Sequence, residues 1–292
     1  MRFAFIDAQK ARFSVTLLCR TLDVSGSGYH AWRRRPPSRR DSENARIAVH
    51  IKGSFARSRE TYGSPRLTDD LRCHGTKTGR HRVAKLLRAS GICARRPKRW
   101  KATTDSQHDM PRAPDLVARQ WDAIATAPNR LWVSDLTYIW TWQGWAYLCV
   151  FLDVYSRKVV GWKVSDTMEA EIVADAAKMG MTRRNPGAGL IWHSDQGSQY
   201  ASSIYRDLSE KHGVRRSMSR RGDCWDNAIA ESFFATLKGN LIDRRSWATR
   251  AQVEDAIGEW IEIFYNGERR HSANGNVSPI DFENLTRGSQ AA

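Results

Sequence analysis

Residues 129–164, NRLWVSDLTYIWTWQGWAYLCVFLDVYSRKVVGWKV, decide the fold class of this 292-residue chain. The stretch is rich in aromatic and β-branched residues, which favour strands. Turn-forming residues interrupt it at Gln143-Gly144 and at Ser156-Arg157. Three apolar runs joined by two short turns predict a meander of three antiparallel strands.

Helix and strand patterns alternate after this meander. The expected elements are a helix at 168–184, a buried strand at 190–195, a helix at 202–213 closed by Gly213, a short edge strand at 214–220, a helix from 228 with Asn227 as its N-cap, and a long helix at 250–266. The last helix carries one apolar stripe, made of Val253, Ile257, Trp260, Ile261 and Phe264. Strands and helices in this order predict an α/β layer fold with a mixed sheet.

The positive charge of the chain is concentrated in its first third. Residues 1–101 contain 25 Lys and Arg against seven Asp and Glu, and the remaining residues contain 22 against 24, for a net charge of +16. Binding to a membrane surface would require one basic amphipathic helix. Several basic helices and a basic tail instead favour nucleic acid as the partner, because binding releases the counterions condensed on its phosphates.

Composition also indicates a cytoplasmic protein. No stretch approaches the roughly 18 apolar residues that a membrane span needs. The N-terminal residues are charged too often for a secretory signal. The five cysteines are scattered without a CxxC pair, which predicts free thiols rather than disulfides or a cysteine-based zinc site: Cys19, Cys73, Cys93, Cys149 and Cys224.

Two helical units precede the α/β region. Residues 14–32 predict two helices around a turn at Gly26 and Gly28, followed by a basic linker at 33–40. In residues 42–93, a helix with Ser64 as N-cap is followed by a basic helix, as in a helix-turn-helix. We expect that basic helix to contact DNA through Arg80, Arg82, Lys85 and Arg88. The predicted regions are a helix-turn-helix-like segment with a linker (1–41), a helix-turn-helix domain (42–93), an extended linker (94–124) and a catalytic core (125–286).

Three acids occupy unusual places in the predicted elements. Asp135 lies within the first strand, Asp195 ends the fourth, and Glu231 lies one turn into an apolar helix. Taken singly, Asp195 fits a turn residue and Glu231 fits the positive end of a helix. Taken together, three buried carboxylates resemble oxygen ligands for Mg²⁺, and a pair of such ions suits phosphoryl transfer.

Four motifs carry a resemblance to a known family: WVSDLTY around Asp135, HSDQGSQY around Asp195, GDCWDNAIAESFFATLK around Glu231, and the closing run YNGERRHSANGNVSPIDFE. Residues 128–286 resemble the retroviral-integrase-type catalytic core, and the whole chain resembles the second-frame (OrfB) product of an insertion sequence of the IS-three family. The 35 residues between Asp195 and Glu231 match the spacing of this branch of the DDE enzymes.

The resemblance implies a fold, a site and partners. The fold would be RNase H-like, and Asp135, Asp195 and Glu231 would hold two Mg²⁺ (or Mn²⁺) ions. Lys238 shares the helix face of Glu231, seven positions on, and in the family this residue contacts the DNA end. Partners would be the terminal repeats and target DNA, a first-frame OrfA protein (alone or as a frameshift fusion) and further copies of the chain on DNA. His193 and Gln199 are expected to be structural.

Two other functions fit parts of the sequence. A catalytically silent DNA-binding regulator of the element would use the basic helices alone, but all three carboxylates are present. An RNase H-like nuclease would act on RNA–DNA hybrids, whereas two basic helical units favour duplex DNA. The expected function is therefore a transposase that cleaves a strand at the element's end and transfers the freed 3′-hydroxyl. One departure from the family is Asn276, where many relatives carry an aromatic residue nearby, and it puts only the local packing in question.

Overall fold

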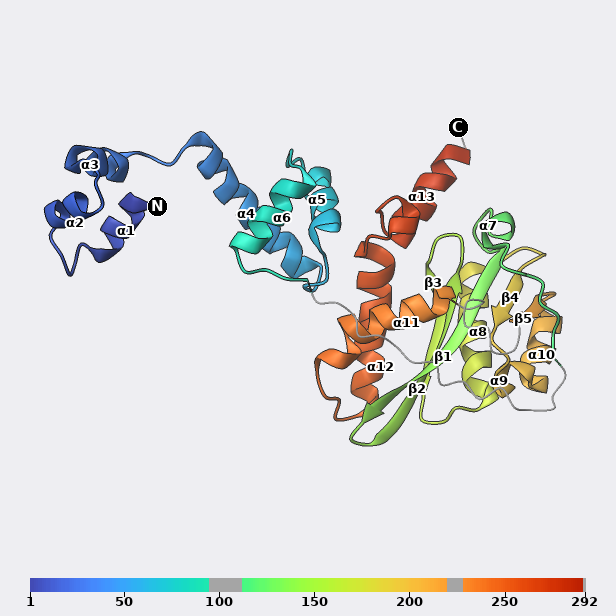
Figure 1. Ribbon diagram of the computed structural model, residues 1–292. Helices are drawn as coiled ribbons and strands as arrows, with labels where there is room; N and C mark the ends of the chain where they lie inside the picture. The colour runs from blue at the N-terminus through green and yellow to red at the C-terminus, as the bar shows by residue number, and fades with distance from the viewer. Residues whose placement is uncertain (95–111, 220–227, 291–292) are drawn as a thin grey trace.

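A computed structural model describes residues 1–94, 112–219 and 228–290 (Figure 1). The N-terminal helices are α1 (Arg2–Gln9), α2 (Val15–Thr21), α3 (Gly26–Arg34), α4 (Arg39–Arg57), α5 (Ser64–Cys73) and α6 (Arg80–Ala89). The α/β region contains α7 (Trp121–Ile124), β1 (Leu131–Thr141), β2 (Gly144–Asp153), β3 (Val159–Ser165), α8 (Ala170–Arg184), β4 (Ile191–Ser194), α9 (Ser198–Ala201), α10 (Ser203–Lys211) and β5 (Arg215–Met218). It continues with α11 (Ala228–Asn240), the 3₁₀ turn η2 (Ile242–Arg244), α12 (Arg250–Glu259), the π-helix η3 (Trp260–Glu268), the 3₁₀ turn η4 (Ser272–Asn274) and α13 (Pro279–Gln290).

The sheet of the described region has the order β3-β2-β1-β4-β5. β1, β2 and β3 pair antiparallel, while β4 runs parallel to β1 and β5 runs parallel to β4. The meander and the mixed sheet are therefore confirmed, as is the place of residues 215–218 at an edge. Gly144 adopts a φ of +100° in the β1–β2 turn, a conformation that glycine adopts readily.

Helices cover both faces of the sheet (Figure 1). Leu131 and Val133 of β1 pack on the face covered by α11, α12 and η3, and Trp132 packs on the face covered by α8, α9 and α10. Alternate residues of a strand point to opposite faces, so Asp135 lies on the α11 side with Leu131 and Val133. The strand alternation thus determines which helix the Asp135 carboxylate meets.

The approach of α8 to the sheet depends on a residue without a side chain. A Cβ added at Gly161 of β3 would lie 2.1 Å from the carbonyl oxygen of Ala176 and 2.8 Å from the backbone nitrogen of Gly180, both in α8. Backbone atoms cannot yield as a flexible side chain does. Glycine at this position therefore permits direct contact between helix and strand.

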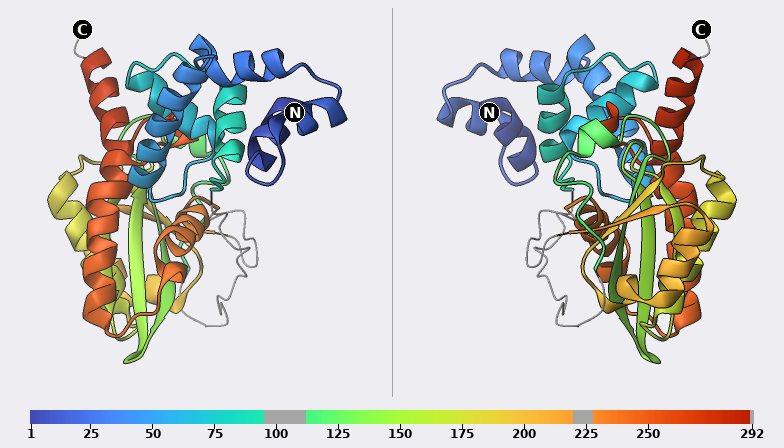
Figure 2. Two further views of the ribbon diagram at one scale, coloured as in Figure 1. Left: turned by 90° about the vertical axis from the view of Figure 1, so that its left-hand side faces the viewer. Right: turned by 90° about the vertical axis from the view of Figure 1, so that its right-hand side faces the viewer.

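The predicted apolar stripe of the helix at 250–266 is confirmed, but the segment is not one regular α-helix. Its stripe residues are fully buried in the core on the α11 face. The helix changes to π geometry at Trp260 and continues to Glu268. Figure 2 shows α12, η3 and α13 as a column along one side of the sheet.

Two local predictions for the N-terminal units were wrong. Gly26 and Gly28 lie inside α3, which Ser25 caps, and the preceding turn bends at Asp23, whose φ is 50°. A Cβ at Gly28 would lie 2.7 Å from Ser25 Oγ, so close packing rather than a turn requires this glycine. Gly63, not Ser64, is the N-cap of α5.

The α4–α6 unit, whose core includes Ile47, Ile51 and Leu67, contacts the C-terminal part of the α/β region. The hydroxyl of Tyr62 accepts a hydrogen bond from the backbone of Arg270 (2.7 Å), whose guanidinium pairs with Asp70 (3.2 Å). The Asn276 amide donates to Asp69 (2.9 Å). The departure at Asn276 therefore has a local role, because its side chain joins the two units.

Part of the segment expected to be an extended linker lies along the sheet edge. The backbone N–H of Leu116 donates to Ser217 Oγ (2.9 Å), and Val117 is buried in the core. The expected N-cap Asn227 and the fifth cysteine, Cys224, lie outside the described residues. The four cysteines within the described ranges are free thiols, as expected.

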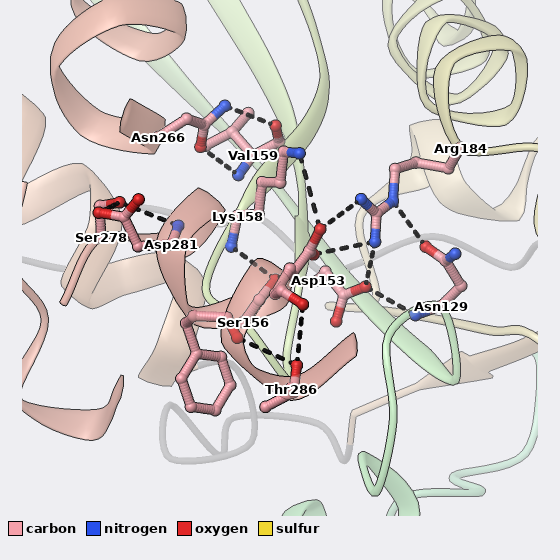
Figure 3. Close-up of polar contacts among 12 residues, drawn as sticks. Asn129, Asp153, Ser156, Lys158, Val159, Arg184, Asn266, Ser278, Asp281 and Thr286 are labelled. Carbon is pink, nitrogen blue, oxygen red and sulfur yellow. Dashed lines mark hydrogen bonds and ion pairs between the residues drawn. The ribbon is translucent and has the colours of Figure 1, made fainter. Parts of the chain in front are cut away.

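A buried charge network attaches α13 to the sheet (Figure 3). Arg184 of α8 donates two hydrogen bonds to the Glu283 carboxylate (2.7 and 2.9 Å) and lies 3.6 Å from Asp153. Ser156 also donates to Glu283 (2.7 Å), and Lys158 lies 3.7 Å from it. Two acids therefore offset two cations in an interior where an unpaired charge is costly.

Candidate active site

Asp135 lies in the middle of β1 and is 8% exposed. Its Oδ1 accepts a hydrogen bond from the backbone N–H of Leu136 (2.8 Å). Burial raises the pKa of this carboxyl well above its usual value, and the nearby charge of Asp195 raises it further. A buried acid with a second acid beside it favours the proton or a bound cation.

Asp195 follows the last residue of β4, the strand that pairs with β1. Its Oδ1 accepts a hydrogen bond from the backbone N–H of Gly197 (3.0 Å), which is an Asx-type turn. A Cβ at Gly197 would lie 3.1 Å from this oxygen, so glycine leaves room for the carboxylate. The Asp195 side chain therefore closes a turn and also lies close enough to Asp135 for its charge to act there.

Glu231 lies in the first turn of α11, beside buried Ala230, Phe233 and Phe234. Burial raises the pKa of Glu231, and its charge contributes to the shift at Asp135 after that of Asp195. We therefore assign the strongest coupling to the two aspartates. Within the described ranges, no three His, Cys, Asp or Glu side chains are placed to hold one metal ion together. The three carboxylates interact through their charges without forming a closed set of ligands.

The donor chemistry fits a hard divalent cation. Mg²⁺ takes oxygen ligands and is usually bound by one or two carboxylates together with substrate phosphates. The repulsion between Asp135 and Asp195 is what such a cation would relieve. By contrast, the Cys149 thiol behind Asp135 has its pKa raised to about 12 by burial, so it is not a thiolate ligand at neutral pH.

Lys238 lies near the other end of α11, with its Nζ 5.4 Å from the centre of the Tyr138 ring. Burial lowers the pKa of its ammonium, and Asp135 is among the negative charges that act on it. A cavity of about 350 Å³ adjoins it, lined by aromatic side chains of the β1–β2 hairpin that include Trp140, Trp142 and Trp145. Sequence reasoning placed these tryptophans in strands and did not assign them to the site.

The basic residues expected on the second helix of the helix-turn-helix unit separate into two groups. Arg80, Lys85 and Arg88 are exposed on α6. Arg82 is directed to α4, where it donates to Asn44 (2.8 Å) and to Glu43 (3.0 Å). Arg82 therefore joins the helices of this unit, while the other three face solvent.

The two polar residues expected to be structural make local contacts. His193 Nδ1 is paired with Ser217 Oγ on the neighbouring strand (2.9 Å), and its ring meets the edge of Trp121. Gln199 donates to the carbonyl oxygen of Met168 (3.0 Å). These contacts are consistent with that expectation.

Comparisons with known proteins agree with this arrangement. Models described as "Integrase core domain" match residues 125–224 and 212–279, and a model described as "HTH-like domain" matches 42–100. The 31 kDa protein of insertion element IS600 from Shigella sonnei is 41% identical over 91% of this chain and 97% of its own length. Transposase InsF for insertion sequence IS3A from Escherichia coli is 37% identical over 97% of this chain and 99% of its own length.

Solved structures with a similar arrangement are more distant. The simian T-cell lymphotropic virus intasome matches 74% of this chain and 70% of its own with 15% identity and a TM-score of 0.46. The catalytic core of HTLV-2 integrase in complex with magnesium matches 55% of this chain and 99% of its own with 14% identity and a TM-score of 0.43. The TM-scores are too low for these likenesses to support a conclusion.

The mixed sheet and the matching family models define the class of the protein: an RNase H-like integrase core preceded by a helix-turn-helix-like domain. The chain belongs to the IS3 family of insertion-sequence transposases, as the second-frame (OrfB) type. It is a transposase whose integrase core mediates transposition. Across the described ranges, no helix combines the length and apolar character needed to span a membrane.

Proposed function

We propose that Asp135, Asp195 and Glu231 form the catalytic triad and hold two Mg²⁺ (or Mn²⁺) ions while a DNA strand is cut and joined. The observation that carries the proposal is the burial of Asp135 beside a second carboxylate, which raises the pKa of Asp135 well above its usual value. When bound, the cations supply stabilisation of the charge that develops on the phosphodiester oxygens.

The residues of the chain have separate tasks in this proposal. Asp135 is held by β1, and Asp195 is held by its turn at Gly197, so this pair is preorganised. Glu231 lies in the first turn of a helix and would be the third carboxylate to hold the cations. The cations held by these acids would position the scissile phosphate, and the apolar residues of α11 pack in the core next to Glu231.

DNA is expected to contact two surfaces. Arg80, Lys85 and Arg88 of α6 would enter a groove or bind phosphates of the terminal repeat, as the second helix of a helix-turn-helix does. Lys238 would hold a phosphate of the element's end near the carboxylates, where a lysine acts as a point charge. A DNA-bound homo-oligomer and a first-frame OrfA partner, in the bacterial cytoplasm, belong to the same proposal.

Strand transfer on labelled element ends with Mg²⁺ tests the triad. Asp135→Asn, Asp195→Asn and Glu231→Gln in the full-length protein should each reduce cleavage and joining to background while DNA binding persists. Asp207→Asn is the matched control, because Asp207 is an exposed acid of α10. Near-normal strand transfer by any of the three variants would remove that residue from the triad.

The same assay separates the alternatives. Reactions run with and without the first-frame protein test whether this chain acts alone. DNA binding without strand transfer under both conditions would favour the silent regulator. Cleavage of RNA–DNA hybrids in preference to element ends would favour the nuclease.

A further inference from the structure

A second cavity, of about 380 Å³ and lined largely by polar side chains, lies between the α4–α6 unit and the catalytic region. Three arginines from separate segments line it: Arg66 of α5, Arg157 of the β2–β3 turn, and Arg269 directly after η3. The first residues of α11 form another wall, together with the hydroxyl-bearing side chains of Ser232 and Thr236. The cavity therefore joins the helix-turn-helix-like unit to the helix that carries Glu231.

Arg269 is 7% exposed, and its Nε has no hydrogen-bond partner within the described structure. Its Nη1 lies 3.3 Å from His271 Nε2. Burial lowers the pKa of Arg269 to about 10, and the charge of Arg66 adds to this. Burial and the charges of the three arginines lower the pKa of His271 to about 2, so this imidazole is neutral at physiological pH.

The three arginines lack acidic partners, unlike their neighbours. Arg270 pairs with Asp70, and the equally buried Arg184 pairs with Glu283 and Asp153. No ion pair joins Arg66, Arg157 or Arg269 to an acid in the part of the chain that the structure describes. The charges of Asp122 and Asp153 act on Arg157 only from beyond ion-pair distance. Gathering three like charges at a partly buried position without a directly paired acid is costly, so the arrangement indicates a place for an anion.

We propose that the Arg66–Arg157–Arg269 pocket binds a phosphate of the DNA backbone. Guanidinium groups match phosphate oxygens with pairs of hydrogen bonds, and helix N-termini also favour anions. Ser232 borders the pocket and directly follows Glu231 in α11, so the pocket and the active-site acid use adjacent positions of one helix, about 1.5 Å apart along its axis. This placement favours DNA over a free phosphate compound, and this choice rests on the proposed function.

The assignment gives the pocket a role in assembly. Arg66 belongs to the DNA-binding unit, whereas Arg157 and Arg269 belong to the catalytic region. One phosphate contacted by all three would add an attraction between the two units only when DNA is present. DNA binding would therefore help to hold the units together.

Thermal unfolding of the full-length, Mg²⁺-free protein tests the pocket directly, with inorganic phosphate as the probe and chloride at equal ionic strength as the reference. Phosphate at several times its Kd should raise the unfolding temperature by roughly 2–4 °C more than chloride does. The Arg66→Gln/Arg157→Gln double variant should lose this difference. Arg215→Gln, which removes an exposed arginine of β5, should retain it.

The behaviour of the double variant without phosphate also decides the matter. Removing two repelling charges should leave the unfolding temperature unchanged or raise it. A fall of more than about 3 °C, beyond the few tenths of a kcal/mol typical of surface changes, would mean that the arginines are paired within the chain. That result would overturn the proposal, as would an equal phosphate effect in the wild-type and double-variant proteins.

A salt titration of binding to an element-end duplex tests whether the phosphate is that of DNA. Loss of one phosphate contact should lower the slope of log affinity against log salt by about 0.9 in the double variant. Arg215→Gln should leave the slope unchanged. An unchanged slope in the double variant, with its phosphate effect lost, would show a site for free phosphate and overturn the DNA assignment.

These measurements need neither metal nor chemistry. Asp135→Asn should show both the phosphate effect and the full salt slope. If strand transfer failed to depend on the triad while both effects persisted, the proposed catalytic site would be wrong and the phosphate pocket would stand. If the triad variants abolished strand transfer but the phosphate effect and the difference in salt slope were both absent, the proposed catalytic site would stand and the phosphate pocket would be wrong.

Discussion

Glu283→Gln should destabilise the catalytic region strongly, because it removes one charge from the buried network of Figure 3. Glu283 is 3% exposed and accepts two hydrogen bonds from Arg184 and one from Ser156. Glutamine has nearly the same shape, so the change isolates charge from packing. It leaves Arg184 with Asp153 at 3.6 Å as its remaining acid.

The magnitude follows from the burial of the pair. Breaking a buried ion pair by removing one partner costs about 3–5 kcal/mol. At roughly 2–4 °C per kcal/mol for a domain of this size, the unfolding temperature should fall by about 6–20 °C. Thermal unfolding followed by both circular dichroism and tryptophan fluorescence measures the change.

An exposed ion pair gives the matched control. Asp175→Asn breaks an exposed pair with Lys178 and should cost at most about 1 kcal/mol. A fall of less than about 1 kcal/mol for Glu283→Gln would refute the reasoning.

The pH dependence of this difference has a definite sign. Burial by itself raises the pKa of Glu283. The hydrogen bonds from Arg184 and Ser156 outweigh this effect, so the pKa of Glu283 lies below its usual value. A carboxyl with a lowered folded pKa contributes stability above its unfolded pKa and loses it as the pH falls. The gap between wild type and Glu283→Gln should therefore narrow in acid.

The remaining predictions concern α8, Lys238 and Asp135. Gly161→Ala forces a Cβ against two backbone atoms of α8 and should lower the free energy of unfolding by about 3 kcal/mol. Gly187→Ala, whose Cβ meets nothing within 4 Å, should change it by less than about 0.5 kcal/mol. Equal effects of the two changes in denaturant titrations would contradict the close contact. Lys238→Ala should weaken capture of short element-end duplexes in a way that more DNA rescues, and a defect that Mg²⁺ rescues instead would count against the phosphate contact. Because the pKa of Asp135 is raised in the folded protein, its contribution to stability is greatest below the unfolded pKa. As the pH rises through the folded pKa, the unfolding temperature in EDTA should fall for the wild type and stay flatter for Asp135→Asn. Parallel curves for the two proteins would show that Asp135 does not titrate in this way.

The sequence by itself determined the features that depend on neighbouring residues in the chain. Aromatic and β-branched runs separated by turn residues were enough to predict the meander, and the period of two along β1 then places Asp135 on the same face as Val133. The helical period was enough to identify the stripe from Val253 to Phe264, although a regular pattern does not reveal where an α-helix widens into a π-helix. Motif order and spacing were enough to identify the family.

Tertiary structure decided the features that depend on residues far apart in the chain. The partner of Glu283 is 99 positions away, and Arg66 reaches the cavity of Arg269 from another domain-sized unit. Gly28 resembled a turn residue because nothing local shows that Phe3 packs above it. Arg82 matched its basic neighbours in sequence, yet Glu43 of α4 determines where its guanidinium lies. Local periodicity specifies which face a side chain occupies, whereas the partner it meets there, and hence whether its charge is free to bind DNA, is set by the packing of distant elements.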